Sequence, residues 1–163
     1  MRYLGIDLGD RRTGLALGDR DTRIISPLPP IQVPWAARDG ADLLDAIARA
    51  ADDVLGSAPA TIVVGLPLNM DGTDGPRARM TRAFAQRMAI RLARPLTLHD
   101  ERLTSSDAEW RLAGSGFTRN QKRQRRDGLA AAAMLSDYFA TLGPSETRTT
   151  SGWQHSTPHP PQG

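Results

Sequence analysis

Cysteine is absent from this chain of 163 residues. The absence excludes disulfide bonds, thiolate metal sites and cysteine nucleophiles, and it fits a reducing compartment. Long apolar runs are missing too: the longest, residues 129–135, has seven residues, whereas a membrane-spanning helix needs roughly 18. Asp7 and Asp10 interrupt the place where the apolar core of a signal peptide would lie. We therefore expect a cytoplasmic protein with no membrane partner.

Lysine is nearly absent as well, because 20 of the 21 basic residues are arginine. The formal net charge is only +3, so the distribution of charge is more informative than its sum. Residues 77–94 hold six arginines and no acid, which we interpret as the solvent side of a helix. Residues 119–126 hold five bases and no acid: Arg119, Lys122, Arg123, Arg125 and Arg126. We expect a basic loop there that contacts phosphates, with a solvated surface as the alternative.

The length and composition predict one folded domain over residues 1–142. Apolar residues make up 39% of the chain and charged residues 24%, as in soluble globular proteins. A chain of this size can bury a sizeable core. Residues 143–163 hold a single large apolar side chain, Trp153, which is too little to offset the entropy lost on ordering. We predict a disordered tail over those residues.

Alternating apolar residues predict strands near the start of the chain. In residues 2–8 the period of two places Leu4, Ile6 and Leu8 on one face and Asp7 on the other. The pattern resumes at residues 15–17 after a tight turn. We predict a third strand over residues 22–25. The four prolines between positions 27 and 34 are then expected to break regular structure.

Helices and strands alternate through the rest of the chain. The predicted helices cover residues 37–56, residues 76 onward, 104–114 and 127–142, and the predicted strands cover 61–66 and 95–99. The apolar side of the second helix is expected to carry Met80, Phe84, Met88 and Leu92. This order predicts an α/β fold with a mixed five-stranded sheet, three antiparallel strands followed by two parallel ones, and helices on both faces.

Three acids lie where folding does not require them. Asp7 is in the middle of a strand, Glu101 follows the carboxyl end of another, and Asp127 begins a predicted helix. Acids are disfavoured inside strands, and α/β sheets bind ligands at the carboxyl ends of their strands. If the first and last parallel strands are neighbours, the three carboxylates converge. Oxygen ligands of this kind select Mg²⁺ or Mn²⁺, and such ions promote phosphodiester cleavage.

Each acid also has a structural alternative. Asp7 could form hydrogen bonds on an exposed edge, Glu101 could pair with Arg102, and Asp127 could cap its helix. Basic residues close to these acids in the sequence would suit contacts with a nucleic-acid backbone. The candidates are Arg11, Arg12, Arg102 and the five bases of residues 119–126.

Four segments, in order over about residues 2–142, together resemble the pre-16S rRNA nuclease family (YqgF type), also described as Holliday-junction-resolvase-like. The segments are GIDLG at 5–9 with GLAL at 14–17, VVGLPLNMDG at 63–72, DERLT at 100–104, and Asp127 with Ala131 and Ala132. The second and third segments are specific to the family. GIDLG alone is weak, because sugar kinases and chaperone ATPases carry a similar motif.

The resemblance implies a ribonuclease-H-like fold and a hydrolase that cleaves nucleic acid with Mg²⁺ or Mn²⁺. It also implies a role in maturing the 5′ end of pre-16S ribosomal RNA, with precursor RNA or ribosomal assembly intermediates as partners. The family's acidic positions fall on Asp7, Glu101 and Asp127, which the resemblance makes both catalytic and metal-binding. Two departures are Asp10, where a small hydroxyl residue is expected, and Arg126, where an apolar residue usually precedes the last aspartate.

Other functions stay open at this point. A DNA endonuclease acting on Holliday junctions would work as a symmetric homodimer, and the sequence leaves both a monomer and a homodimer open. A non-catalytic RNA-binding assembly factor would need the basic residues but not the three acids. An actin-like phosphotransferase is disfavoured, because that architecture needs two lobes of this kind around a nucleotide cleft.

Overall fold

The computed structural model describes residues 1–103 and 119–143, with the backbone alone for Leu103 and residues 119–125. Its strands are β1 (Arg2–Leu8), β2 (Thr13–Asp19), β3 (Ile24–Ile31), β4 (Ala60–Leu66) and β5 (Leu96–Asp100). They form one sheet in the order β3-β2-β1-β4-β5. The first three strands are antiparallel, while β4 pairs parallel with β1 and β5 parallel with β4. The predicted mixed sheet is confirmed.

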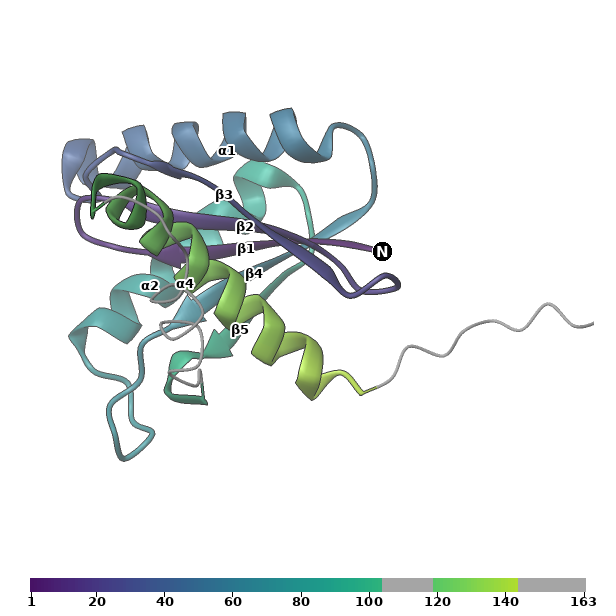
Figure 1. Cartoon of the computed structure of the whole chain (residues 1–163). Helices are drawn as coiled ribbons and strands as arrows, with labels where there is room; N and C mark the ends of the chain where they lie inside the picture. Colours follow the sequence, from purple (N-terminus) through teal and green to yellow (C-terminus); the bar gives the residue numbers. More distant parts are fainter. Residues whose placement is uncertain (104–118, 144–163) are drawn as a thin grey trace, which may run out of the picture.

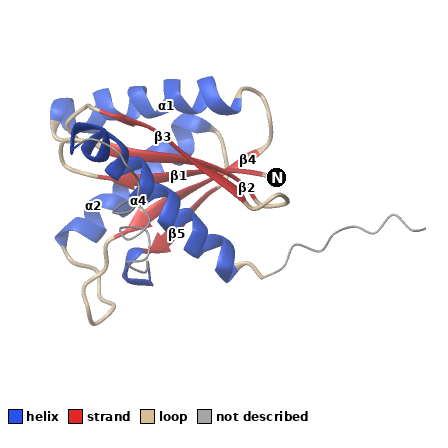
Figure 2. Ribbon diagram, viewed as in Figure 1, coloured by secondary structure: helices blue, strands red, loops and turns tan. Residues whose placement is uncertain are grey.

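Helices cover both faces of this sheet (Figures 1 and 2). A short 3₁₀ turn, η1 (Ala37–Gly40), leads into α1 (Ala41–Leu55), and α2 is Pro76–Leu92. These two helices pack on one face, and α4 (Arg119–Thr141) packs on the other. A single turn, η2 (Glu101–Leu103), follows β5. The predicted helix over residues 104–114 and the predicted tail beyond residue 143 lie outside the described residues.

The side-chain alternation of β1 sets the two cores. Leu4, Ile6 and Leu8 all face α1 and α2 and are buried there, as the period of two predicts. The other face of the sheet packs on α4. The buried residues of this second core are Tyr3, Ala16 and Val63 of the sheet and Ala131, Met134, Leu135 and Phe139 of α4. Asp7 shares the face of Tyr3, so its side chain lies on the α4 side of the sheet. No helix among the described residues is long and apolar enough to cross a membrane.

The prediction for β3 is wrong in its length. The strand does not end at residue 25 but continues to Ile31 through Pro27, Pro29 and Pro30. It is one of the two edge strands of the sheet, so one of its sides has no partner strand. Proline has no N–H group to donate to a neighbouring strand. An edge strand tolerates it because one of its sides has no neighbour to receive such a bond.

The predicted apolar side of α2 is correct at Phe84 and Met88 but wrong at Met80, which is 53% exposed. The buried stripe instead includes Ala78, Thr81 and Ala85. These small side chains let α2 approach the sheet and α1 closely. Rotation of the helix toward them leaves Met80 at the surface.

The start of α4 also differs from the prediction. Residues 119–126, expected to form a basic loop, are the first two turns of α4, which begins at Arg119. Asp127 therefore lies inside the helix rather than at its first residue. The N-cap alternative for Asp127 is wrong, and the positive end of the helix dipole does not act on its carboxylate, because that effect is confined to the first turn.

Candidate active site

Asp7 is the penultimate residue of β1, close to the edge where β1, β4 and β5 all end. Because the three strands are parallel to one another, side chains that follow their last residues meet at this edge. Asp7 is partly buried between the sheet and α4. It lies on a central strand, so the alternative that it is a hydrogen-bonding acid on an exposed sheet edge is wrong.

Glu101 reaches Asp7 across β4. The sheet order places β4 between β1 and β5, so the first and last parallel strands are not neighbours, which was the condition for the three acids to converge. Gly65 of β4 makes the crossing possible: a Cβ atom built on it would lie 2.0 Å from Oε1 of Glu101. The Glu101 carboxyl therefore occupies the space that a side chain at position 65 would fill, and it forms a hydrogen bond with Asp7.

Burial and the closeness of the two carboxyls change their acidity. Burial raises the pKa of Glu101 to about 7, and the negative charge of Asp7 acts in the same direction. The pKa of Asp7 is also raised by burial, although its hydrogen bond with Glu101 opposes the rise. Two neighbouring carboxylates repel each other when both are ionised, so the pair holds a proton more tightly than either acid would alone.

Asp127 is brought to the pair by a backbone contact between α4 and β2. Gly14 stands opposite Asp7 in the sheet, and a Cβ atom on Gly14 would lie 2.0 Å from the carbonyl oxygen of Asp127. The charge of Asp127 raises the pKa of Asp7 further. Its Oδ2 atom is buried and has no hydrogen-bond partner among the residues that the structure describes, while Nη1 of Arg12 lies 3.6 Å away.

The geometry of these acids can be compared with the needs of a divalent cation. Among residues 1–103 and 119–143 no cluster of three or more potential ligand side chains is tight enough to hold a metal as it stands. Asp7 and Glu101 nevertheless present hard oxygen ligands side by side, and Asp127 adds a buried oxygen that lacks a hydrogen bond. This donor set fits Mg²⁺ or Mn²⁺.

Arg77, in the first turn of α2, is a residue of this site that the sequence interpretation missed. Its Nη2 atom donates to the carbonyl oxygen of Leu8 at 3.0 Å, and its positive charge lowers the pKa of both Asp7 and Glu101. Its Nη1 atom donates to Asp10. The lack of any acid in residues 77–94 was the available signal, but it was interpreted as a solvent-facing surface.

The departure at Asp10 is explained by this arrangement. Asp10 is largely exposed and pairs with Arg77, so it does not join the three acids. Gly128, which follows Asp127, also has a structural reason: a Cβ atom there would lie 2.7 Å from the carbonyl oxygen of Leu28 in β3. The backbone of α4 therefore approaches β2 at Asp127 and β3 at Gly128.

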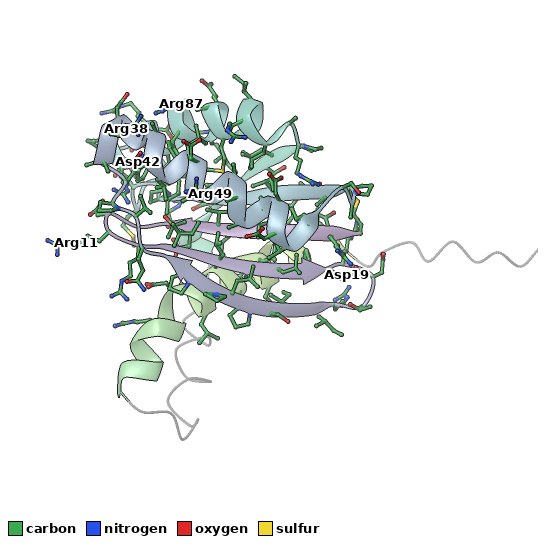
Figure 3. All side chains as sticks on the ribbon, turned by 90° about the horizontal axis from the view of Figure 1, so that it is seen from above. Arg11, Asp19, Arg38, Asp42, Arg49 and Arg87 are labelled. Carbon is green, nitrogen blue, oxygen red and sulfur yellow. The ribbon has the colours of Figure 1, made fainter. Side chains whose placement is uncertain are left out.

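The predicted nucleic-acid contacts fall into separate groups. Arg12 pairs with Asp127. Arg102 pairs with Asp100 at 2.7 Å and donates to the carbonyl oxygen of Met70 at 3.1 Å, so its expected pairing with Glu101 is wrong. Arg11 is exposed at the turn between β1 and β2 and points away from the molecule (Figure 3). The other five predicted bases, at positions 119, 122, 123, 125 and 126, lie in the first turns of α4.

Known proteins are similar to this chain in sequence. Residues 1–141 match the model of the RuvX family, described as Holliday junction resolvase. A protein of Anaeromyxobacter sp. (strain Fw109-5) named "Putative pre-16S rRNA nuclease" is 44% identical over 139 residues, 85% of this chain and 96% of the relative. One of the same name from Methylocella silvestris is 36% identical over 86% of this chain and 83% of its own length.

A solved structure shares the fold at low sequence identity. Thermus thermophilus RuvC in complex with Holliday junction substrate superimposes with a TM-score of 0.52 and 15% identity, covering 88% of this chain and 98% of that one. The predicted ribonuclease-H-like fold is thus confirmed. With the family match over residues 1–141 and relatives well above 30% identity, the chain belongs to the RuvX family.

Proposed function

We propose that this protein is a divalent-cation-dependent nuclease whose site is formed by Asp7, Glu101 and Asp127. The observation that carries the proposal is the hydrogen-bonded carboxyl pair of Asp7 and Glu101 at the carboxyl edge of the sheet. Buried acids that repel one another weaken a fold. Their collection at one point is understandable if the pair exchanges its proton for a cation.

Each acid has a distinct part in holding the cation. Asp7 is fixed by the central strand, Glu101 is fixed by its passage over Gly65, and Asp127 contributes from α4. A bound Mg²⁺ or Mn²⁺ supplies Lewis-acid activation of the attacking water and neutralises charge on the phosphoryl group. Because the pKa of Glu101 is about 7, its carboxyl is partly ionised near neutral pH, and a nearby cation would favour the ionised form. Hydrolysis then adds water across one P–O ester bond of the backbone.

The substrate we propose is the precursor of 16S ribosomal RNA, cut near its 5′ end in the cytoplasm, free or within assembly intermediates. The curated relatives carry this substrate in their name. We assign Arg11 and the bases at the start of α4 to the RNA backbone. Arg11 lies in the turn that follows β1, and the bases lie in the helical turns that precede Asp127. Contacts of that kind position a strand without reading its sequence.

Branched DNA is the second candidate substrate. The description of the RuvX family as Holliday junction resolvase favours it. The three acids serve both substrates equally well, since the bond that is hydrolysed is the same.

One assay separates these possibilities. Purified protein is incubated with a 5′-extended 16S precursor and with a four-way DNA junction, each with Mg²⁺, with Mn²⁺ and with EDTA. We expect cation-dependent cleavage of the RNA by the natural protein, and its loss in Asp7→Asn with RNA binding retained. Cleavage of the junction alone would transfer the function to DNA. Full activity in Asp7→Asn would remove this site from the reaction.

A further inference from the structure

A cavity of about 520 Å³ opens between the start of α2 and the segment that joins β3 to α1. Its volume lies within the range of sites that bind small molecules or single nucleotides. It lies on the α1 and α2 side of the sheet, whereas Asp7 faces α4. The cavity is therefore separate from the three acids.

The floor of the cavity is apolar. Trp35 and Phe84 lie in ring contact, with their centroids 5.3 Å apart, and Met80 and Ala83 form the adjoining wall. Both rings are buried, but Met80 and Ala83 are exposed to solvent. The displacement of Met80 from the core thus leaves a flexible thioether at the mouth of the cavity, a side chain that adapts to flat ligands.

Two guanidinium groups lie over the aromatic rings of this floor. The Arg77 Cζ atom is 4.4 Å from the centre of the Trp35 ring, and that of Arg87 is 5.6 Å from the centre of Phe84. Both also have fixed acceptors: Arg77 donates to Asp10, and Nη1 of Arg87 donates to the carbonyl oxygen of Asp39 at 2.7 Å. These hydrogen bonds hold each guanidinium group in place beside its ring.

Charge in the cavity is balanced. Asp10 and Asp39 line it together with Arg77 and Arg87, so its formal charge is zero. A phosphate gains little there, because the guanidinium donors are partly used and two carboxylates would repel it. A neutral, flat ring that carries N–H donors suits the site better. It can stack on guanidinium planes and donate to the exposed carboxylates.

Arg77 links the cavity to the catalytic edge. The same guanidinium that covers Trp35 binds the carbonyl oxygen of Leu8, the residue after Asp7. A strand that places one phosphate at Asp7 and Glu101 therefore passes Arg77 before it reaches the cavity. In Figure 3, Arg87 and the exposed Arg11 lie at the same end of the molecule, and Asp19 lies at the other.

We propose that this cavity binds one unstacked base of the substrate strand, a few nucleotides at most from the phosphate that is cut. The inference rests on the proposed function in one respect, since it takes a nucleic-acid strand as the ligand. The base stacks against the guanidinium of Arg77 and the side chain of Met80. Its amino or imino N–H groups donate to Asp10 or Asp39, which favours guanine, cytosine and adenine over uracil and thymine, since those two offer a single imino donor and no amino group.

The absence of cysteine allows a direct test. Ala83→Cys places the only thiol of the chain in the cavity wall, and Ile90→Cys places it on the same helix at a side chain that is 83% exposed and does not line the cavity. Each variant is labelled with a bulky maleimide. Binding to fluorescent single-stranded RNA and DNA of mixed sequence is then measured in EDTA, before and after labelling, so that no cleavage is required.

We expect the label at position 83 to weaken binding by about tenfold, the loss typical of one stacked base, and the label at position 90 to change it less than twofold. A scan of the oligonucleotide with single abasic sites should show one sensitive position in unlabelled protein. With that abasic strand, the label at position 83 should have no further effect. Comparison of the RNA and DNA arms tells which kind of strand supplies the base.

Equal effects of the two labels would overturn the inference, and so would a flat abasic scan, which would mean that the cavity holds no base. These results are independent of the nuclease assay. A protein that shows the sensitive position but cleaves nothing would refute the proposed function and leave the base site standing. A protein that cleaves with Mg²⁺ but shows no sensitive position would do the reverse.

Discussion

At the scale of single residues, Gly65 determines how Glu101 meets Asp7. The carboxyl of Glu101 passes over β4 in the space where any other residue would carry its Cβ atom. The backbone of Gly65 does not have a positive φ angle, so glycine is needed there for space and not for conformation. The sequence shows Gly65 only as part of a motif. Its purpose depends on the order of strands in the sheet, which local patterns do not encode.

We predict that Gly65→Ala displaces the Glu101 side chain. The overlap should lower the free energy of unfolding by about 1–3 kcal/mol, as overpacking does in well-packed sites, and should abolish cation-dependent cleavage. The control is the same substitution in a Glu101→Ala background, where the overlap is gone and the cost should be small. Denaturant titration of the four proteins measures the coupling. Additive effects would mean that Glu101 does not occupy this space.

The pKa of Glu101 predicts how stability changes with pH. Below about pH 4.5 the group is protonated in both the folded and the unfolded protein. Between pH 4.5 and about 7 the unfolded chain releases this proton while the folded protein keeps it, so the free energy of unfolding falls as pH rises. In EDTA, Glu101→Gln should show a shallower fall over this window in urea titrations. Identical pH profiles for the two proteins would show that Glu101 titrates normally.

At the scale of elements, close packing of α4 positions Asp127. Glycines at positions 14, 18 and 128 leave no side chain between the helix and the strands beneath it. A Cβ atom added at any of the three would lie less than 3.0 Å from a neighbouring heavy atom. Gly14 also pairs with Asp7 in the sheet. The location of Asp127 near Asp7 is therefore a consequence of backbone contact between α4 and β2.

Gly128→Ala tests this packing. Within an exposed helix the change would stabilise the protein by about 1 kcal/mol. Here the added Cβ atom would lie 2.7 Å from the carbonyl oxygen of Leu28, so we expect a lower free energy of unfolding and weaker cleavage. Ser136→Ala, at an exposed position of the same helix, serves as the control. An increase in thermal midpoint for Gly128→Ala would contradict the packing.

The elements differed in how well the sequence predicted them, for physical reasons. The face of β1 was correct because a period of two relates directly to the sides of a sheet. The prolines of β3 were misleading, since their tolerance depends on the strand being at an edge. Arginine is a good helix former, so residues 119–126 are compatible with a helix. Its start was missed because Asp127 followed by Gly128 resembles the beginning of a helix. Arg77 was missed because its partners come from β1 and its following turn, distant in sequence.

At the scale of the whole molecule, the arrangement of basic groups predicts which of them bind phosphates. Arg102 is tied to Asp100 and to the loop after β4, so it has a structural task. Arg11 is exposed and extends from the turn next to Asp7 and Asp10 (Figure 3). Of the two, Arg11 is the better placed to meet a strand that enters the site.

Arg11→Gln should weaken RNA binding at every sequence and reduce the slope of log K against log salt by about 0.7–0.9, the value for one phosphate contact. Arg49→Gln, an exposed position on α1, removes the same charge from another surface and is the matched control. Fluorescence anisotropy over a series of salt concentrations measures both slopes. An equal loss of slope in the two variants would mean that only net charge matters.

The proposed nuclease activity requires that Asp7, Glu101 and Asp127 form one cation site, and Mn²⁺ binding tests this most directly. Crystals of the protein grown in EDTA and soaked with Mn²⁺ would be examined by anomalous diffraction. We predict a peak within direct bonding distance of oxygens of both Asp7 and Glu101, close to the range of about 2.0–2.1 Å that Mg²⁺ adopts, with their mutual hydrogen bond broken. Asp7→Asn should lose that peak. An empty site under saturating Mn²⁺, with the two carboxyls still joined by their hydrogen bond, would contradict the account.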